Sequence, residues 1–389
     1  MSSELQRIKE VAVEALKIIE RYDTSLQKAY SKALQDLKLK PSRASYEFLY
    51  NLVMNYYALQ YTFMKKRGRP ARPKELVDFY VAGEHLNVPL PQSPLRRLSV
   101  EASYPYWLVQ RLSKYFDLEA LGELLKALNK RMIWLLCLAK PNEVVRALAD
   151  EGVEAKVDED LDYMVEVLKS DKPPSRLGPV RRGVAVPVDK ASALVVEALR
   201  AQGVEVLDAC AAPGVKSSIL VLRGTPLVIA IDKSKSRIRE AVKLLSKFNV
   251  QDRVLLVLGD SRRPPVSRRF AKALADVPCS GTGAVGDDPS VKIRLSKPNK
   301  VKMYHKTQVK LLSSISKVAD EVIYASCSLL PEEGEQVVDE CDVDVEKLEA
   351  PPTVDCYRGF KCSGKARRTM PHMHRCSAFF IALCRARES

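Results

Sequence analysis

Residues 206–217 read VLDACAAPGVKS, in which a short apolar segment ends at Asp208 and small residues follow, with Pro213 and Gly214 among them. The pattern is typical of a strand that runs into a tight turn and then into a helix. In an open α/β sheet such a turn lies in the ligand crevice at the carboxyl end of the strand, where a cofactor can approach the backbone closely. The segment therefore predicts a cofactor-binding α/β domain.

Strands and helices alternate around this segment from residue 184 onward. The alternation is typical of a doubly wound parallel sheet with helices on both faces. We expect strands at residues 205–209, 227–232, 253–258, 271–276 and 321–326, and then a terminal hairpin that ends in residues 378–384.

Three aspartates, Asp208, Asp232 and Asp260, stand at or just beyond the ends of successive predicted strands. A carboxylate at the end of the second strand can accept hydrogen bonds from ribose hydroxyls, and Asp260 is placed to contact an adenine ring. Strand-end carboxylates commonly cap the following helix instead. Because three of them occur in register on successive strands, we favour the cofactor role.

Two cysteines follow later strands of the same series. Cys279 lies in DVPCSGTG, residues 276–283, and Cys327 lies in YASCSLL, residues 324–330. Both are expected at the sheet edge that carries the turn after Asp208. A lone cysteine at a strand end is most often a small buried hydrophobic residue. Two cysteines at equivalent strand ends, one of them preceded by Asp276, indicate a role in the reaction rather than in packing.

Upstream of this domain the apolar spacing is helical over residues 3–98 and again over 106–131. Residues 88–97, VPLPQSPLRR, contain three prolines and predict a connector. A strand at 133–138, a helix at 143–151 and an apolar segment at 163–168 predict a small α/β unit. We therefore expect an all-helical domain at 1–100, connector helices with a small α/β subdomain at 101–183, and the main α/β domain at 184–389.

The chain of 389 residues carries 63 Lys and Arg against 48 Asp and Glu, a formal net charge of +15, with clusters such as Arg262-Arg263. A cationic surplus favours a polyanionic partner through counterion release, although basic runs can also be solvated surface. The sequence has no apolar stretch long enough for a membrane helix and no signal-peptide pattern, so we expect a cytoplasmic monomer without a membrane partner. Its nine cysteines are then expected as thiols.

The motifs DACAAPGVKS, DVPCSGTG and YASCSLLPEEGEQVV resemble the successive signatures of the RNA cytosine carbon-5 methyltransferases of the Nol/Nop/Sun family. The C-terminal RTMPHMHRCSAFFIALCRAR is similar to the closing motif of that family. The helical N-terminal region resembles the NusB-like RNA-binding domain of the Sun/Fmu (RsmB-like) branch. The segments SYPYWLVQRL and LLKALNKRMIWLLCLAK resemble the connector and small RNA-binding subdomain of the same branch.

The resemblance implies a Rossmann-like class I methyltransferase domain with a seven-stranded sheet and a reversed terminal hairpin. It implies that S-adenosylmethionine is the cofactor and that the product is 5-methylcytosine in structured RNA, with ribosomal RNA favoured over transfer RNA. By resemblance, Cys327 adds to carbon 6 of the base and Cys279 assists release. Asp276 contacts the cytosine edge, and Lys216 lies near the base or the methionine part of the cofactor.

Val215 stands where the family has a second glycine, and residues 186–192 resemble a substrate-side motif that lacks its usual glutamine, so no contact is assigned to them. The residues expected to bind the cofactor are Asp208, Cys210, Ala211, Ala212, Pro213, Gly214, Lys216, Asp232, Arg237, Asp260 and Asp276.

A zinc site is the main rival reading for Cys356, Cys362, His372, His374 and Cys376, which lie close in sequence. Their spacing fits none of the usual zinc patterns, so we expect no metal. Whether the three cysteines form disulfides stays open.

Two other functions remain as alternatives. A non-catalytic RNA-binding factor in ribosome assembly would keep the basic surface but would not need both Cys279 and Cys327. A methyltransferase of small molecules or proteins would share the aspartates but lack the paired cysteines. The joint presence of the two cysteines favours the RNA methyltransferase.

Overall fold

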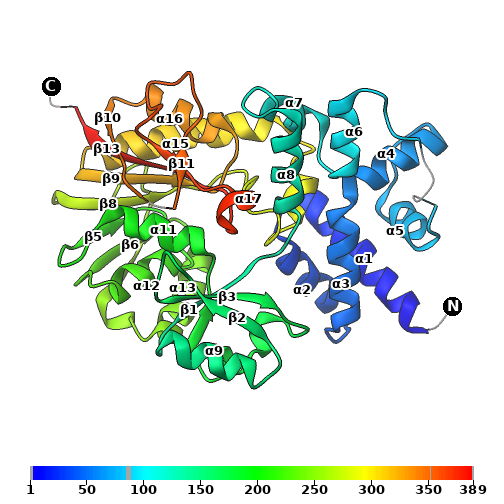
Figure 1. Ribbon diagram of the computed structural model, residues 1–389, viewed down its shortest axis with the longest axis horizontal. Coiled ribbons are helices and arrows are strands. Elements are labelled where there is room, and N and C mark those ends of the chain that lie inside the picture. The colour runs from blue at the N-terminus through cyan, green and yellow to red at the C-terminus, as the bar shows by residue number, and fades with distance from the viewer. Residues whose placement is uncertain (1–2, 85–88, 351, 388–389) are drawn as a thin grey trace. The chain divides into compact units, whose positions relative to one another are not determined.

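The computed structural model describes residues 3–84, 89–350 and 352–387 (Figure 1). The chain divides into two compact units. The helical unit comprises Met1–Lys130 together with Ser280–Lys300, and the sheet unit comprises Arg131–Cys279 together with Val301–Ser389. The assignment of three functional domains stays a prediction.

The helical unit is built from amphipathic helices whose apolar residues recur at helical spacing. In α1, for example, Val11, Ala15 and Ile19 are buried in one core, which helices α2 to α5 share. Its helices are α1 (Ser3–Tyr22), α2 (Leu26–Leu37), α3 (Arg43–Met54), α4 (Tyr56–Arg67), α5 (Pro73–Val81), α6 (Pro94–Glu101), α7 (Tyr106–Leu112), α8 (Leu118–Leu128) and α14 (Ser290–Arg294).

The sequence prediction was wrong in one place in this unit. Helix α6 begins at Pro94, inside the expected connector, because a proline is compatible with the first turn of a helix. The helical spacing over 106–131 corresponds to the two helices α7 and α8, and Asp117 caps the second by accepting a hydrogen bond from the Ala120 N–H at 2.8 Å. Val88, the first residue of the expected connector, lies outside the described residues.

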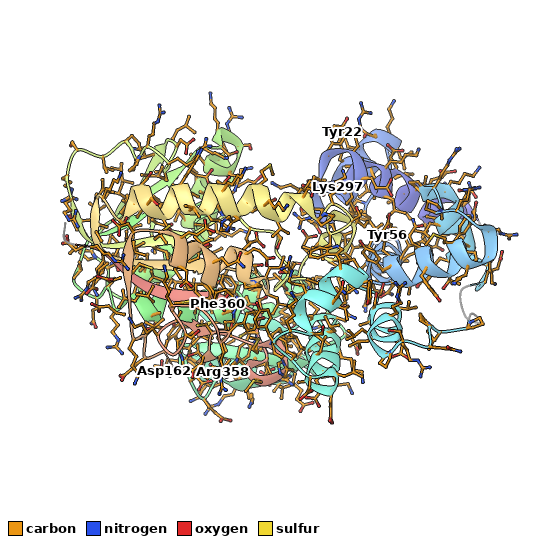
Figure 2. The ribbon with its side chains drawn as sticks, turned by 90° about the horizontal axis from the view of Figure 1, so that it is seen from above. Tyr22, Tyr56, Asp162, Lys297, Arg358 and Phe360 are labelled. Atoms are coloured by element: carbon orange, nitrogen blue, oxygen red, sulfur yellow. The ribbon has the colours of Figure 1, made fainter. Side chains whose placement is uncertain are left out.

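Segment 280–300 packs within the helical unit although it follows a strand of the large sheet in sequence. Ile293 joins the apolar core, and Trp107 donates a hydrogen bond to the Leu295 carbonyl at 3.0 Å. The Glu20 carboxylate accepts a hydrogen bond from the Tyr56 hydroxyl at 3.3 Å, and the Glu20 backbone carbonyl accepts one from the Lys297 ammonium at 3.3 Å. Tyr56 and Lys297 are labelled in Figure 2. These contacts tie the segment to helices far earlier in the chain.

The sheet unit begins with a small four-stranded sheet in the order β2-β3-β1-β4, in which each neighbouring pair is antiparallel. Leu135, Val165 and Val167 pack beneath helix α9 as its apolar core. The elements are β1 (Ile133–Cys137), α9 (Pro141–Ala149), β2 (Glu154–Val157), β3 (Met164–Lys169), a 3-10 turn at Pro174–Arg176, α10 (Gly178–Arg181) and β4 (Ala185–Pro187).

The large sheet has the order β11-β12-β13-β9-β8-β5-β6-β7, and β10 pairs with β13 as a further branch. Strands β5 to β9 are parallel, and β13 runs antiparallel to β9, as the reversed terminal hairpin requires. The strands are β5 (Val206–Asp208), β6 (Val228–Asp232), β7 (Val254–Leu258), β8 (Phe270–Asp276), β9 (Ala319–Ser326), β10 (Val343–Glu346), β11 (Val354–Asp355), β12 (Arg367–Arg368) and β13 (Phe380–Ala386). The sequence predicts seven strands, whereas the described residues form nine, because β11 and β12 are two-residue additions.

Two apolar cores lie on opposite faces of this sheet (Figure 1). Val206 and Leu207 are adjacent and fully buried, yet they belong to different cores because successive side chains of a strand point to opposite faces. Helices α11 (Lys190–Leu199), α12 (Val215–Leu222) and α13 (Lys235–Phe248) cover one face, and α15 (Asn299–Ile315) and α16 (Glu335–Glu340) cover the other; α17 spans Pro371–His374. None of the described helices has the length and apolar character that a bilayer-crossing segment requires.

Candidate active site

Strand order reverses at β5, which pairs with β6 on one side and β8 on the other. Ligands of open α/β sheets bind at this reversal, outside the carboxyl ends of the strands. The turn after Asp208 reaches helix α12 through Gly214, whose φ of +100° lies in the left-handed region. Val215 is already the first helical residue, so the positive φ falls on the glycine and a β-branched residue is accommodated after it.

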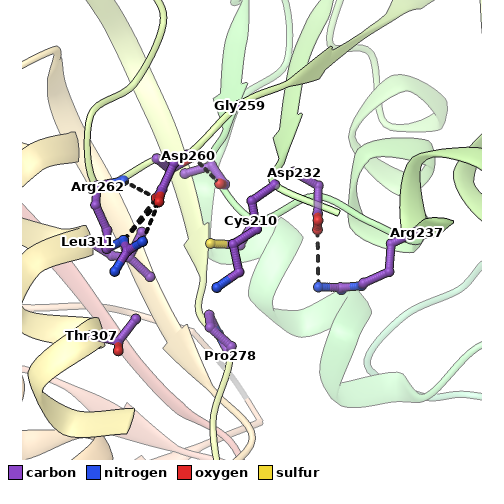
Figure 3. Close-up of a pocket in the computed structure, with 12 residues that line it drawn as sticks. Cys210, Asp232, Arg237, Gly259, Asp260, Arg262, Pro278, Thr307 and Leu311 are labelled. Atoms are coloured by element: carbon purple, nitrogen blue, oxygen red, sulfur yellow. Dashed lines mark hydrogen bonds and ion pairs between the residues drawn. The ribbon is translucent and has the colours of Figure 1, made fainter. Parts of the chain in front are cut away.

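A cleft with an empty volume of about 430 Å³ opens between this turn and helix α15 (Figure 3). Asp232 and Asp260 lie on its wall, as the sequence predicts. The lining residues are Ala209, Cys210, Asp232, Lys233, Arg237, Gly259, Asp260, Ser261, Arg262, Pro278, Thr307 and Leu311.

Both cleft aspartates interact with neighbouring donors. Asp232 is buried, accepts from the Ser234 N–H at 2.8 Å and pairs with Arg237 at 3.1 Å. Arg237 also donates to the Ala212 carbonyl, so it joins the cofactor turn to the end of β6. Hydrogen bonds from Arg262 lower the pKa of Asp260 to about 2. The Asp260 carboxylate can therefore accept hydrogen bonds from a ligand at neutral pH.

A second cavity, of about 600 Å³, adjoins the same turn and shares Cys210 with the first. It brings together Asp208, Lys216 and Asp276, which the sequence assigns to cofactor and base. Gly214 lines neither cavity; its role is to start α12. The lining residues are Pro187, Val188, Asp189, Ser192, Asp208, Cys210, Ala211, Ala212, Pro213, Val215, Lys216 and Asp276.

Lys216 and Asp276 form a nearly buried ion pair, with Nζ and Oδ2 separated by 2.7 Å. Burial disfavours the Lys216 ammonium, but the Asp276 charge and hydrogen bond outweigh it and raise the pKa of Lys216. The Phe379 ring lies 4.9 Å from Nζ and adds a cation–π contact. The Cys327 sulfur also interacts electrostatically with this ammonium. Lys216 is therefore a stable cation that lies within electrostatic range of the Cys327 sulfur.

Cys279 and Cys327 are brought together although they are far apart in the chain, with their sulfur atoms 3.0 Å apart. Asp276 at the end of β8 pairs with Ala325 of β9, so the loops that carry both thiols leave adjacent strands. Both thiols are partly exposed. One of them can act as a nucleophile while the other exchanges a proton at the same place.

Asp208 presents a hydrogen-bonding atom that the described residues leave unused. One oxygen accepts from the Ser217 hydroxyl at 2.6 Å, and the other, Oδ1, is buried without a partner among the described side chains and backbone. Burial raises the pKa of this carboxyl to about 7. A bound ligand with a cationic donor would satisfy Oδ1 and favour the ionised carboxylate.

The site contains a third cysteine, Cys210, which differs from the other two. Burial and the nearby carboxylates raise the pKa of its thiol well above the ordinary range. It lines both cavities as a neutral side chain. The geometry therefore supports a packing contact with a cofactor and argues against Cys210 as the nucleophile.

Several lining residues were not found from the sequence. Arg262 belongs to a basic cluster that we interpreted only as surface charge, and Thr307 lies on a helix with no motif of its own. Asp189 and Ser192 lie in the segment to which we assigned no contact, yet both line the second cavity, and Ser192 Oγ is 3.4 Å from Lys216 Nζ. The likeness of that segment to a substrate-side motif was the signal that could have identified them.

The C-terminal cysteines and histidines form a different kind of cluster. All nine cysteines are free thiols, and Cys356 and Cys362 approach to 3.9 Å between sulfur atoms. Within the described ranges, no group of three or more His, Cys, Asp or Glu side chains is arranged to hold a metal ion.

Comparison with known proteins identifies the sheet unit further. Residues 196–385 match the family model described as 16S rRNA methyltransferase RsmB/F. A probable ribosomal RNA small subunit methyltransferase B from Coxiella burnetii is 28% identical over 66% of this chain and 62% of its own length. The human 28S rRNA (cytosine(4447)-C(5))-methyltransferase is 32% identical over 49% of this chain and 26% of its own length. The chain thus spans from about a quarter to just under two thirds of these two relatives.

The fold extends further than the sequence similarity. The crystal structure of PH0851 superposes with a TM-score of 0.78 and covers 99% of both chains at 20% sequence identity. At that identity the similarity speaks for a shared fold alone. The family match and the observed sheet together assign residues 196–385 to a methyltransferase fold with a mixed sheet. Residues 196–385 therefore form a domain that matches the RsmB/F methyltransferase family.

Proposed function

We propose that the chain methylates carbon 5 of a cytosine in structured RNA, with ribosomal RNA as the substrate and S-adenosylmethionine as the methyl donor. One observation carries the proposal: two thiols, Cys279 and Cys327, lie 3.0 Å apart near the Lys216–Asp276 pair, at the same sheet edge as the cleft that Asp232 and Asp260 line. Carbon 5 of cytosine is a weak nucleophile, so this chemistry needs a thiolate, a base and a positioned proton donor or acceptor.

Cys327 is the proposed nucleophile. Its thiolate forms a bond to carbon 6 of the base, and the electron pair of the 5,6-double bond becomes available at carbon 5 for transfer of the methyl group. The Lys216 ammonium, fixed by its ion pair, lies within electrostatic range of this sulfur. The base must leave its stack in the RNA to reach this position.

Asp276 is the proposed partner of the cytosine edge. The ring nitrogen takes up a proton from solvent during addition and returns it to solvent on elimination. While this nitrogen is protonated, the carboxylate accepts a hydrogen bond from it, and Lys216 holds the carboxylate in place at 2.7 Å. Cys279 then removes the proton from carbon 5. The electrons of that C–H bond restore the double bond, the carbon–sulfur bond breaks, and Cys327 leaves as a thiolate.

The cofactor site fits S-adenosylmethionine in three respects. Asp232 supplies a buried acceptor at the end of β6 for ribose hydroxyls, and the Asp260 carboxylate supplies a second acceptor on the wall of the cleft. Asp208 Oδ1 is a buried acceptor that still needs a donor, which the α-ammonium of the cofactor can provide. When bound, this cofactor supplies an electrophilic methyl group on its sulfonium.

RNA binding by the helical part is also proposed, with residues 1–100 as a NusB-like domain and 101–183 as the connector and small subdomain. The exposed cations Lys65, Lys66 and Arg67 at the end of α4 support this assignment, because they provide a compact site for phosphate contacts. A monomeric state and a cytoplasmic setting stay predictions from the sequence.

The proposal is tested by bisulfite sequencing of ribosomal and transfer RNA after incubation with the protein and S-adenosylmethionine. A single protected cytosine is expected in ribosomal RNA with the wild type and with Cys137→Ala, a cysteine outside the site. Cys327→Ala should protect none while it still binds the cofactor. A protected cytosine found only in transfer RNA would show that transfer RNA, and not ribosomal RNA, is the substrate. Full activity of Cys327→Ala would contradict the assigned nucleophile.

A second variant tests the division of roles between the thiols. Cys279→Ala should leave Cys327 joined to the RNA, because the step that removes the carbon-5 proton is blocked. A denaturing gel would then show a protein band shifted by the mass of the RNA. No shifted band with Cys279→Ala would contradict the release role.

A further inference from the structure

The two loops that carry the thiols are joined by a chain of buried side chains outside the proposed mechanism. Gln308, on α15, is fully buried, and its Nε2 donates to the Pro278 carbonyl at 2.9 Å and to Glu333 Oε1 at 3.3 Å. The other Glu333 oxygen accepts from the Ser328 hydroxyl at 2.7 Å. Pro278 precedes Cys279 and Ser328 follows Cys327. Three hydrogen bonds therefore link the neighbour of one thiol to the neighbour of the other.

The orientation of the Gln308 amide follows from its partners. Both are acceptors, so the NH₂ group must face them. The amide oxygen, Oε1, is then left buried without a hydrogen-bond partner among the described residues, which is unfavourable. A leucine would fill similar space without this cost. The Gln308 amide can therefore stabilise the structure only through the two hydrogen bonds that its NH₂ group donates.

The Cys327 loop has further anchors that do not involve Gln308. Arg368 donates to the Ser328 carbonyl at 2.8 Å, and Ser326 donates to the Glu333 carbonyl at 2.6 Å. These contacts remain when Gln308 is replaced. Loss of the amide should therefore release the loop of Cys279 while Cys327 keeps its position.

We infer that Gln308 is a positioning residue that holds Cys279 in register with Cys327 through Glu333. The structural part of this inference is independent of the reaction, and its kinetic consequence rests on the proposed function. Without Gln308, Cys327 still forms its covalent adduct with the base, but Cys279 is less often in position to remove the carbon-5 proton.

The structural part is tested by disulfide formation with oxidised glutathione as the oxidant. One thiolate displaces glutathione to form a mixed disulfide, and the other displaces the second glutathione, so that two thiols are oxidised and one glutathione disulfide is reduced. The rate of the Cys279–Cys327 cross-link, mapped by mass spectrometry, should fall about tenfold in Gln308→Leu. Gln60→Leu is the matched control, because Gln60 also bonds backbone, at Ala71, but in the helical unit. Equal rates in wild type and a folded Gln308→Leu would overturn the inference.

The kinetic part is read from the covalent adduct with RNA. Gln308→Leu should accumulate the adduct as Cys279→Ala does, with a lower kcat and a KM for RNA within about twofold of wild type, since only a step after binding is slowed. If wild type fails to methylate RNA and Cys279→Ala fails to form an adduct, the proposed function falls while the cross-linking result still stands. If those two behave as expected and Gln308→Leu shows no adduct, the inference falls.

A second variant keeps the test decisive if Gln308→Leu does not fold. Gln308→Asn keeps the amide but is one methylene shorter, so it cannot reach both Pro278 and Glu333. A slower cross-link in Gln308→Asn supports the inference, and a wild-type rate overturns it.

Discussion

Replacing Lys292 with methionine should destabilise the helical unit. The Lys292 side chain is fully buried, and its Nζ donates to the carbonyls of Met54, Ala102 and Ser103 at 2.8, 3.0 and 3.0 Å. Burial lowers the pKa of this group, but a neutral amine has only two N–H donors for three acceptors, so the bonds favour the ammonium. The three carbonyls lie at the ends of α3 and α6, where helical partners are missing.

The magnitude follows from these contacts. Methionine keeps the apolar stem but removes the Lys292 donor from the Met54 and Ser103 carbonyls, a loss of about 1 kcal/mol each, whereas the Ala102 carbonyl still accepts from Asn129 at 3.0 Å. It also removes the cation–π contact of Nζ with the Tyr104 ring at 4.1 Å, about 1 kcal/mol more. Relief from dehydrating the ammonium offsets part of this, so we expect a net loss of about 2 kcal/mol. In a unit of about 150 residues this lowers the Tm by roughly 4–8 °C.

The chain offers a clean assay because it has two tryptophans, Trp107 in the helical unit and Trp134 in the sheet unit. In a Trp134→Phe background, urea unfolding followed by fluorescence reports the helical unit alone. Lys302→Met is the control, since Lys302 is exposed on α15 and should change stability by less than about 0.5 kcal/mol. A Lys292→Met variant as stable as this control would refute the reasoning.

Three further predictions concern the sheet unit. Because burial raises the pKa of Asp208 to about 7, the folded protein binds a proton that the unfolded chain releases near pH 4, so stability should fall as pH rises from about 4 to 7. Asp208→Asn should flatten that slope in urea midpoints measured across this range, and parallel slopes would contradict the assignment. Asp232→Ala should weaken cofactor binding about tenfold to a hundredfold by calorimetry, through loss of a charged hydrogen-bond acceptor, and unchanged affinity would remove Asp232 from the site. Arg368→Met should cost about 3–5 kcal/mol because it leaves the fully buried Glu335 unpaired, whereas adding Glu335→Leu should restore most of the loss, and a double variant no more stable than the single one would count against this.

The sheet was predictable because its signal is local. Apolar runs that end in aspartates define β5 and β6 to within one or two residues, and the shared carboxyl edge follows from parallel strands. Lys216 and Asp276 were placed near the base by resemblance, and the structure brings them into one ion pair. Their roles in the reaction stay predictions.

The features that could not be predicted from the sequence depend on contacts between distant segments. Lys292 reads as one more surface cation, yet it is fully buried beneath helices that end at residues 54 and 101. Gln308 lies in a lysine-rich helix with no motif around it, and its partners are thirty residues upstream and twenty-five downstream. Sequence spacing cannot predict such pairs, because periodicity indicates which face of a helix or strand is buried but not which distant residues pack against it.

The interleaved order of the two units gives the Gln308 contact a physical rationale. Cys279 is the last residue of the sheet unit before the chain enters segment 280–300, which Lys292 and Ile293 anchor in the helical core. Cys279 therefore lies where the chain leaves the sheet unit. The hydrogen bond that Gln308 donates to the Pro278 carbonyl ties the preceding residue to α15. A buried amide that leaves its own oxygen unsatisfied is understandable at this position, because its NH₂ group bonds the Cys279 loop directly and the Cys327 loop through Glu333.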